Sequence, residues 1–226
     1  MRTEVSYSPA FAMATVSLEQ GESVKAEAGA MMAMSPGIEI QTSTQGGVLK
    51  GLKRSVLGGE SFFMNTFKAT GPDAHVVLAP TLPGDIVTWE MANQTIYLQS
   101  GAYLASAETI DIDTKWGGAK TFFSREGLFM LKCTGTGQLV VSSYGAIVAK
   151  DLQPGEVYTV DSGHMVGWGE GIQYNVRKAG NWKSTILGGE GLVVELTGPG
   201  RIYVQTRSED AFLGWLIPKL PKTSSS

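Results

Sequence analysis

Cysteine and histidine are scarce in this chain. Its 226 residues include a single cysteine, Cys133, and only two histidines, His75 and His164. One cysteine cannot form an internal disulfide, and this set gives none of the spacings that structural zinc sites use. We therefore expect a protein without disulfides, structural metal or cofactor.

Strong net charge and long apolar runs are also absent. The formal net charge of −3 provides no broad basic surface for a phosphate backbone, so the composition argues against nucleic-acid binding. No segment reaches the roughly 18 consecutive apolar residues of a membrane-spanning helix. The N-terminal segment 1–21 lacks the unbroken apolar core of a secretory signal. We expect a cytoplasmic protein that contacts a membrane peripherally at most.

Glycine, in contrast, is abundant and separates short alternating segments. The chain has 29 glycines, many of them in Gly-Gly, Pro-Gly and Gly-Pro pairs that favour tight turns. Segments 37–43, 109–116 and 200–206 alternate apolar and polar residues with period two, as half-buried strands do. The pattern predicts an all-β fold of the sandwich or barrel type.

One segment near the C-terminus, 208–218, predicts a helix. Ser208 is the predicted N-cap, and Pro218 is the predicted stop. The apolar side chains recur at i, i+3 and i+4 and need a covering surface: Phe212, Trp215 and Leu216. They are candidate contacts to the β-core, to a neighbouring subunit or to a membrane interface. Protein packing is favoured, because the helix is short and has few cations near it.

Two sequence elements recur in the same order and predict three internal repeats within one compact unit. The first element is Leu, a polar pair and Gly before an alternating segment, starting at Leu18, Leu98 and Leu152. The second is Gly-Gly, an apolar strand, Thr-Gly and another apolar strand, starting at Leu57, Trp116 and Leu187. We place the repeats at about 16–95, 96–150 and 151–207, followed by the C-terminal helix and tail at 208–226.

The run Asp161-Ser162-Gly163-His164 contains the residue types of a hydrolase site. A nucleophile and its base need mutual hydrogen-bond reach, whereas neighbours in a strand point to opposite faces. The segments matched to it in the other repeats, 25–30 and 106–111, hold no histidine, and the chain has no Gly-x-Ser-x-Gly elbow. We interpret the run as a structural turn involving Asp161 and His164, with ligand binding as the alternative.

Two further groups are candidates for ligand contact. Segment 46–59 lacks the order of a phosphate-binding P-loop, so it is either a solvated loop or a contact for an anion, a lipid, RNA or a partner. Its cations are Lys50, Lys53 and Arg54. Aromatic residues can stack on bases in single-strand binders, although core packing explains these without a ligand: Trp89, Tyr97, Trp116, Trp168 and Trp182.

Several longer motifs occur together in a fixed order. They are KGLKRSVLGGESFFMNTF, PGDIV, SREGLFMLK, SSYGAI, VDSGHMVGW and GEGLVVELTGPGRIYVQTRS. With them the chain closely resembles the family of altered inheritance of mitochondria protein 24, from about Val16 to Pro221. The resemblance implies a fold similar to the tryptophan RNA-binding attenuator protein, with three such β-modules fused in one chain. It implies no catalytic residue, and the absence of an Arg- and Ser-rich transit segment favours a bacterial member.

We therefore predict a non-enzymatic protein that associates with itself and serves as a scaffold or interaction protein for an unidentified protein partner. The related fold closes rings from single modules, so we expect a homo-oligomer, with a trimer as the preferred size. The alternative is a small-molecule or anion-binding module that uses grooves between the repeats. RNA binding and hydrolysis rank behind it.

Overall fold

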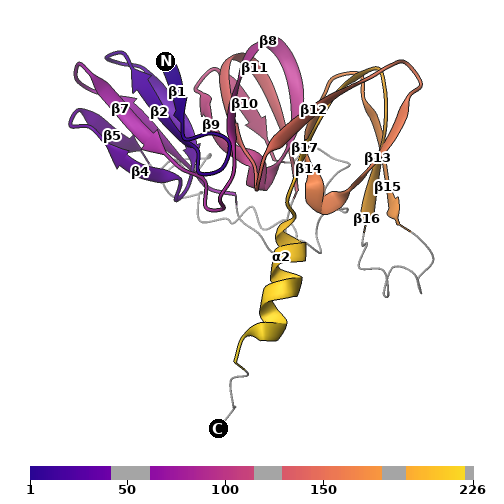
Figure 1. Ribbon diagram of the computed structural model, residues 1–226. Helices are drawn as coiled ribbons and strands as arrows, with labels where there is room; N and C mark the ends of the chain where they lie inside the picture. The colour runs from indigo at the N-terminus through magenta and orange to yellow at the C-terminus, as the bar shows by residue number, and fades with distance from the viewer. Residues whose placement is uncertain (42–61, 115–128, 180–191, 222–226) are drawn as a thin grey trace, which may run out of the picture.

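The computed structural model describes residues 1–41, 62–114, 129–179 and 192–221, and most of them lie in short antiparallel strands. The sheets lie side by side, and helix α2 (Glu209–Leu216) projects away from them toward the C-terminus (Figure 1). The predicted all-β class with one short C-terminal helix is therefore confirmed for the described residues.

The first sheet has the strand order β1-β2-β7-β4. Its strands are β1 Arg2–Ser6, β2 Met13–Leu18, β4 Met31–Met34 and β7 Ala74–Leu78. Along β2 and β7 buried positions alternate with exposed or half-buried ones, because successive side chains of a strand point to opposite faces. The period-two pattern thus decides which side chains enter the core.

The largest sheet has the order β12-β17-β14-β8-β11-β9-β3-β6-β5, with β10 paired to β11. Its strands are β3 Ser23–Glu27, β5 Ile38–Gln41, β6 Met64–Ala69, β8 Ile86–Gln99, β9 Tyr103–Ala107, β10 Ile110–Asp113, β11 Met130–Ser142, β12 Ile147–Leu152, β14 Met165–Gly169 and β17 Gly200–Gln205. The third sheet, β13-β16-β15, contains β13 Val157–Asp161, β15 Gln173–Lys178 and β16 Leu192–Thr197. Short 3-10 turns complete the described elements: η1 Ser100–Ala102, η2 Ser162–His164 and η3 Ile217–Lys219.

Helix α2 begins where the sequence predicts. The Ser208 side chain accepts a hydrogen bond from Ala211 N at 3.3 Å, which satisfies one of the free amides of the first turn. Glu209 and Asp210 lie in that turn, near the positive end of the helix dipole. The chain leaves the α-helix at Ile217 and continues as η3, which contains Pro218.

Three units of the chain share one pairing scheme. In the N-terminal unit (13–78), β2-β7-β4 and β3-β6-β5 are the paired triplets. In the C-terminal unit (147–205), β12-β17-β14 and β13-β16-β15 match them strand by strand. In the middle unit (86–142), β8 and β11 are long enough to replace two strands each, and β9 and β10 both pair with β11.

The predicted boundaries between repeats fall within strands, since 95/96 lies inside β8 and 150/151 lies inside β12. The matched Leu-x-x-Gly elements have different places in the fold. After Leu18 and Leu152 the chain turns back, and a glutamate side chain bonds to the start of each turn. Glu22 accepts a hydrogen bond from the backbone N–H of Glu19 at 2.8 Å, and Glu156 accepts one from the backbone N–H of Gln153 at 2.9 Å. Leu98 instead lies one residue before the end of β8, a strand that passes the corresponding point without turning and carries Asn93 there at φ 59°.

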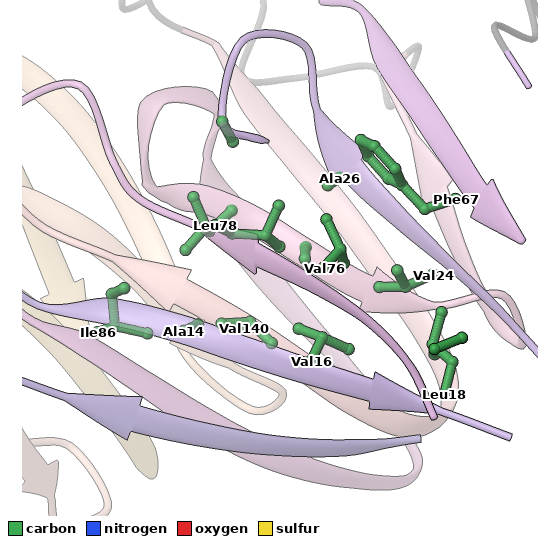
Figure 2. Close-up of a cluster of buried hydrophobic side chains, with 14 of the residues drawn as sticks. Ala14, Val16, Leu18, Val24, Ala26, Phe67, Val76, Leu78, Ile86 and Val140 are labelled. Atoms are coloured by element: carbon green, nitrogen blue, oxygen red, sulfur yellow. The ribbon is translucent and has the colours of Figure 1, made fainter. Parts of the chain in front are cut away.

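The hydrophobic core of the N-terminal unit extends into the middle unit. Figure 2 shows Ile86 of β8 and Val140 of β11 beside Ala14, Val16 and other side chains of the N-terminal unit. Two more clusters continue along the sheets, one mainly around β8, β9 and β11 and one in the C-terminal unit. Neighbouring units therefore share apolar contacts as well as strand pairs.

Candidate functional site

The Asp161–His164 turn lies at the end of β13, and the side chains of Asp161 and His164 each contact a backbone group. Asp161 Oδ1 accepts from Gly163 N at 3.0 Å, and His164 Nδ1 lies 2.8 Å from the carbonyl oxygen of Gln205. Gln205 Nε2 also donates to Gly163 O at 3.0 Å, and Gln205 Oε1 accepts from Tyr144 N at 2.9 Å. The imidazole Nδ1 is therefore engaged by β17 and not by the neighbouring carboxylate. The arrangement joins three segments of the chain at one turn.

Each unit has a turn at the place of Asp161. The strand pairs make Ala26 and Leu98 equivalent, since they face Ala105 and Gly167 in corresponding registers. The residue that follows each of these positions is therefore equivalent as well: Glu27 in the N-terminal unit and Gln99 in the middle unit. Asp161 is their counterpart in the C-terminal unit. Segment 106–111, which the repeat pattern matched to the Asp161–His164 run, is consequently not its structural equivalent in the middle unit. Segment 97–102 takes its place, and it also lacks histidine.

The equivalent turns meet at a depression at the base of the sheets. Glu27, Gln99 and Gly163 line it from the three units, and Glu209 and Asp210 line it from the first turn of α2. Burial raises the pKa of the Glu27 carboxyl to about 7. A depression lined by three acidic residues favours a neutral or cationic molecule over an anion. Within the described residues no group of His, Cys, Asp or Glu is arranged to hold a metal ion.

Helix α2 presents the predicted apolar side chains, and they remain partly exposed. No residue of α2 is buried: Trp215 is 58% exposed, Phe212 is 37% exposed, and Leu216 is half-buried. The Phe212 ring meets the ring of Tyr144 edge-on, with 6.2 Å between the centroids. Lys219 Nζ lies 5.0 Å above the Trp215 ring. No helix in the described part of the chain has the length and apolar character needed to cross a membrane.

The aromatic candidates within the described residues pack on one another. Trp168 is 1% exposed and lies between Tyr97, at 5.9 Å, and Tyr174, at 5.0 Å between ring centroids. Trp89 lies 4.1 Å from the ring of Tyr203. Stacking within the protein occupies these ring faces and leaves Trp168 no open surface for a base. Trp116 and Trp182 lie outside the described residues, as do the candidate cations Lys50, Lys53 and Arg54.

Sequence reasoning missed that β4 and β13 lie at the edges of their sheets. Every residue of β4 is exposed, whereas the equivalent strands β9 and β14 are largely buried. The first three residues of β13 are exposed as well, although β3 and the second half of β8 are covered. The apolar run Met31–Met34 was the available signal, but only the strand pairing shows that no other strand in the described part of the chain covers its outer edge.

Comparisons with known proteins match almost the whole chain. The family model described as Mitochondrial biogenesis AIM24 matches residues 3–207 and thus stops before α2. An uncharacterized protein of Streptococcus pyogenes serotype M6 is 30% identical over 233 residues, which cover 100% of this chain and 93% of that protein. The crystal structure of a Streptococcus pyogenes protein, a structural genomics target, is similar with a TM-score of 0.81 and 29% identity. That match covers 97% of this chain and 99% of the other.

Proposed function

This chain belongs to the Mitochondrial biogenesis AIM24 family, as its motifs predict, and on that premise we propose that it is a homo-oligomeric scaffold or interaction protein without catalytic activity. One observation carries the proposal. Helix α2 projects from the sheets (Figure 1), and none of its residues is buried: Trp215 is 58% exposed, and Phe212 and Leu213 are each 37% exposed.

The exposed apolar surface continues beyond α2. Trp215, Ile217 and Leu220 are 58%, 60% and 54% exposed. Apolar side chains grouped on a protruding element mark a contact surface, because leaving them in water costs free energy that a partner recovers. A helix of this length is also marginal by itself in water, so a surface that packs against it stabilises the helix as well.

A second copy of the chain is the partner that we propose, with a trimer as the preferred size. Contacts between two different ends of neighbouring copies are head to tail, and they close into a ring when the rotation between copies permits. An unidentified protein partner on the same surface is compatible with the scaffold role. A membrane surface is the competing occupant, since Trp215 and Lys219 suit an interface with anionic lipid.

Light scattering coupled to size exclusion tests the proposal. The full chain should form oligomers, and a chain ending at Ser208 should be smaller or less soluble while circular dichroism shows most of its β-structure intact. Trp215→Ser should weaken assembly in the same direction. Gly214→Ala is a matched control on the same helix, because an added Cβ there has no atom within 4 Å.

Three results would overturn parts of this proposal. A monomer at every concentration removes the oligomer. If the shortened chain assembles normally and only the full chain floats with anionic vesicles, α2 is a membrane anchor. An esterase or peptidase turnover that disappears in His164→Ala, with folding intact, contradicts the absence of catalysis.

The depression at Glu27 favours one alternative, a module that binds a small neutral or cationic molecule between the units. Its lining by Gln99, Glu209 and Asp210 suits such a ligand. Native mass spectrometry of the purified chain should then detect a bound small molecule, and Glu27→Ala should abolish that adduct.

A further inference from the structure

Two junctions within the chain join neighbouring units through the same kind of strand pair. At the first, β3 pairs antiparallel with β9, and at the second, β8 pairs antiparallel with β14. The registers correspond, since Lys25 faces Ser106 at one junction and Tyr97 faces Trp168 at the other. The chain therefore uses one rule twice: the second strand of a unit covers the third strand of the next unit.

The rule leaves one strand of each kind without its partner. β4 corresponds to β9 and β14, but among the described strands it pairs only with β7. β13 corresponds to β3 and to the second half of β8, but within the same described residues it pairs only with β16. The two strands lie at opposite ends of the row of sheets (Figure 1). At one end of the molecule β4 thus has the open edge of a third strand, and at the other end β13 corresponds to the second strands that cover such edges at the two internal junctions.

Burial shows the missing cover on β4 directly. Its three methionines are exposed, at 38% for Met31, 59% for Met32 and 42% for Met34. The residues at the same positions in the covered strands are at most 1% exposed: Tyr103, Leu104 and Ser106 in β9, and Met165, Val166 and Trp168 in β14. The first unit therefore retains apolar residues at positions that are buried wherever a neighbour is present.

The same comparison holds for β13. Val157 is 54% exposed and Tyr158 is 43% exposed. At the place of Tyr158, Val24 of β3 is 0% and Ile96 of β8 is 5% exposed. By contrast, β5, β10 and β15 are outer edges in all three units, so their lack of a second neighbour implies no missing partner.

We propose that a second copy of this chain docks by strand addition, with its β13 pairing antiparallel to β4 of the first copy. The inference rests on the proposed self-association and names a second surface for it, in addition to α2. Transferring the register of the two internal junctions places Val160 opposite Ala33, Thr159 opposite Met34, and Tyr158 opposite Ser35. Neither β4 nor β13 contains the lysine or proline with which soluble proteins protect free edges.

Cysteine cross-linking between two separately made variants tests the pairing. One full-length chain carries Met34→Cys and the other carries Thr159→Cys, so a disulfide between them can only join different copies. Directly opposed residues of an antiparallel pair have the Cα separation that a disulfide needs. The natural Cys133 stays in both chains, because it is 0% exposed and burial raises the pKa of its thiol to about 12.

Mixing the two variants under mild oxidation should give a covalent dimer that either variant alone does not give. Ile40→Cys on β5 replaces Met34→Cys as the matched control, since Ile40 is 40% exposed but lies on an edge that is open in every unit. This control should yield no dimer with Thr159→Cys above background. In a second measurement, the double variant Met34→Lys, Thr159→Lys should raise the dissociation constant about tenfold, because it opposes like charges. Met34→Lys with Thr159→Glu should restore assembly.

The outcomes separate this inference from the proposed function. If the chain is oligomeric but the mixed variants form no specific dimer and the lysines have no effect, self-association stands and the β4–β13 pairing is wrong. A chain carrying both cysteines that forms only an internal disulfide would show closure within one copy and would also overturn the pairing. A chain that is monomeric at all concentrations removes both proposals.

Discussion

Met31 and Met165 are the same residue type at the same position of equivalent strands, and their surroundings are opposite. Met31 on β4 is 38% exposed, whereas Met165 on β14 is 0% exposed. The difference is the neighbour: β8 covers the outer edge of β14, and no strand among the described residues covers that of β4. Burial at this position is thus a property of the junction between units, and the strand's own residues do not determine it.

Removing each methionine side chain tests this comparison most strongly. Met165→Ala should lower the free energy of unfolding by about 2–5 kcal/mol, because it leaves a cavity in a closed core. Met31→Ala should cost less than about 1 kcal/mol in dilute solution, where β4 is uncovered. Urea denaturation at low protein concentration measures both. Equal costs there would mean that β4 is already covered within a single copy.

The glycine at the second junction gives a smaller expected effect. A Cβ at Gly167 would meet the backbone oxygen of Tyr97 across the β8–β14 pair, whereas the first junction accommodates Ala105 at the equivalent position. Gly167→Ala should therefore cost about 1–3 kcal/mol through overpacking. Gly214→Ala, in the open helix, should instead gain up to about 1 kcal/mol. Thermal melts that show Gly167→Ala to be neutral would indicate a junction looser than this structure.

Glu27, one of the three equivalent turn residues, predicts an effect of pH on stability that is similar to or smaller than the effect of Gly167→Ala. The pKa of Glu27 rises from an ordinary 4.5 to about 7 on folding, so the folded state holds the proton more tightly. Stability should fall as the pH rises from about 4.5 to 7 and then level off, by roughly 1–2 kcal/mol after solvent screening. Glu27→Gln should flatten this profile and be the more stable form above pH 7.

Melting temperatures from pH 4 to pH 8 measure that profile. The middle unit supplies the converse variant, because Gln99 occupies the equivalent position and is only 4% exposed. Gln99→Glu should add a second decrease of the same sign. A wild-type profile that rises between pH 4.5 and 7 would contradict the environment inferred for Glu27.

The sequence predicted the local elements well where the signal is contained in neighbouring residues. Alternation identified the segments that form β5, β10 and β17, and the cap at Ser208 with the acids after it located the start of α2. The Leu-x-x-Gly-Glu turns after Leu18 and Leu152 were matched correctly as well. The similar residue pattern that starts at Leu98 lies at a different place in the fold, because β8 replaces two strands of the other units and carries no turn.

The candidate sites depend on contacts between residues that lie far apart in the chain. Asp161 and His164 were interpreted as a turn, and their recorded bonds go to Gly163 N and Gln205 O. Gln205, which holds that turn, lies 41 residues beyond His164, and no local pattern links the two. The depression lined by Glu27 likewise combines residues of three units and of α2.

By itself the sequence determined the all-β class, the capped C-terminal helix, the turns and the family. Each of these depends on interactions between residues close together in the chain or on motifs matched as a whole. Only the tertiary structure decided which strand edges are covered, which turns converge on Glu27, and how β8 and β11 span the middle unit. The physical reason is that an edge is buried or exposed according to which strand lies beside it, and that strand comes from a distant part of the chain.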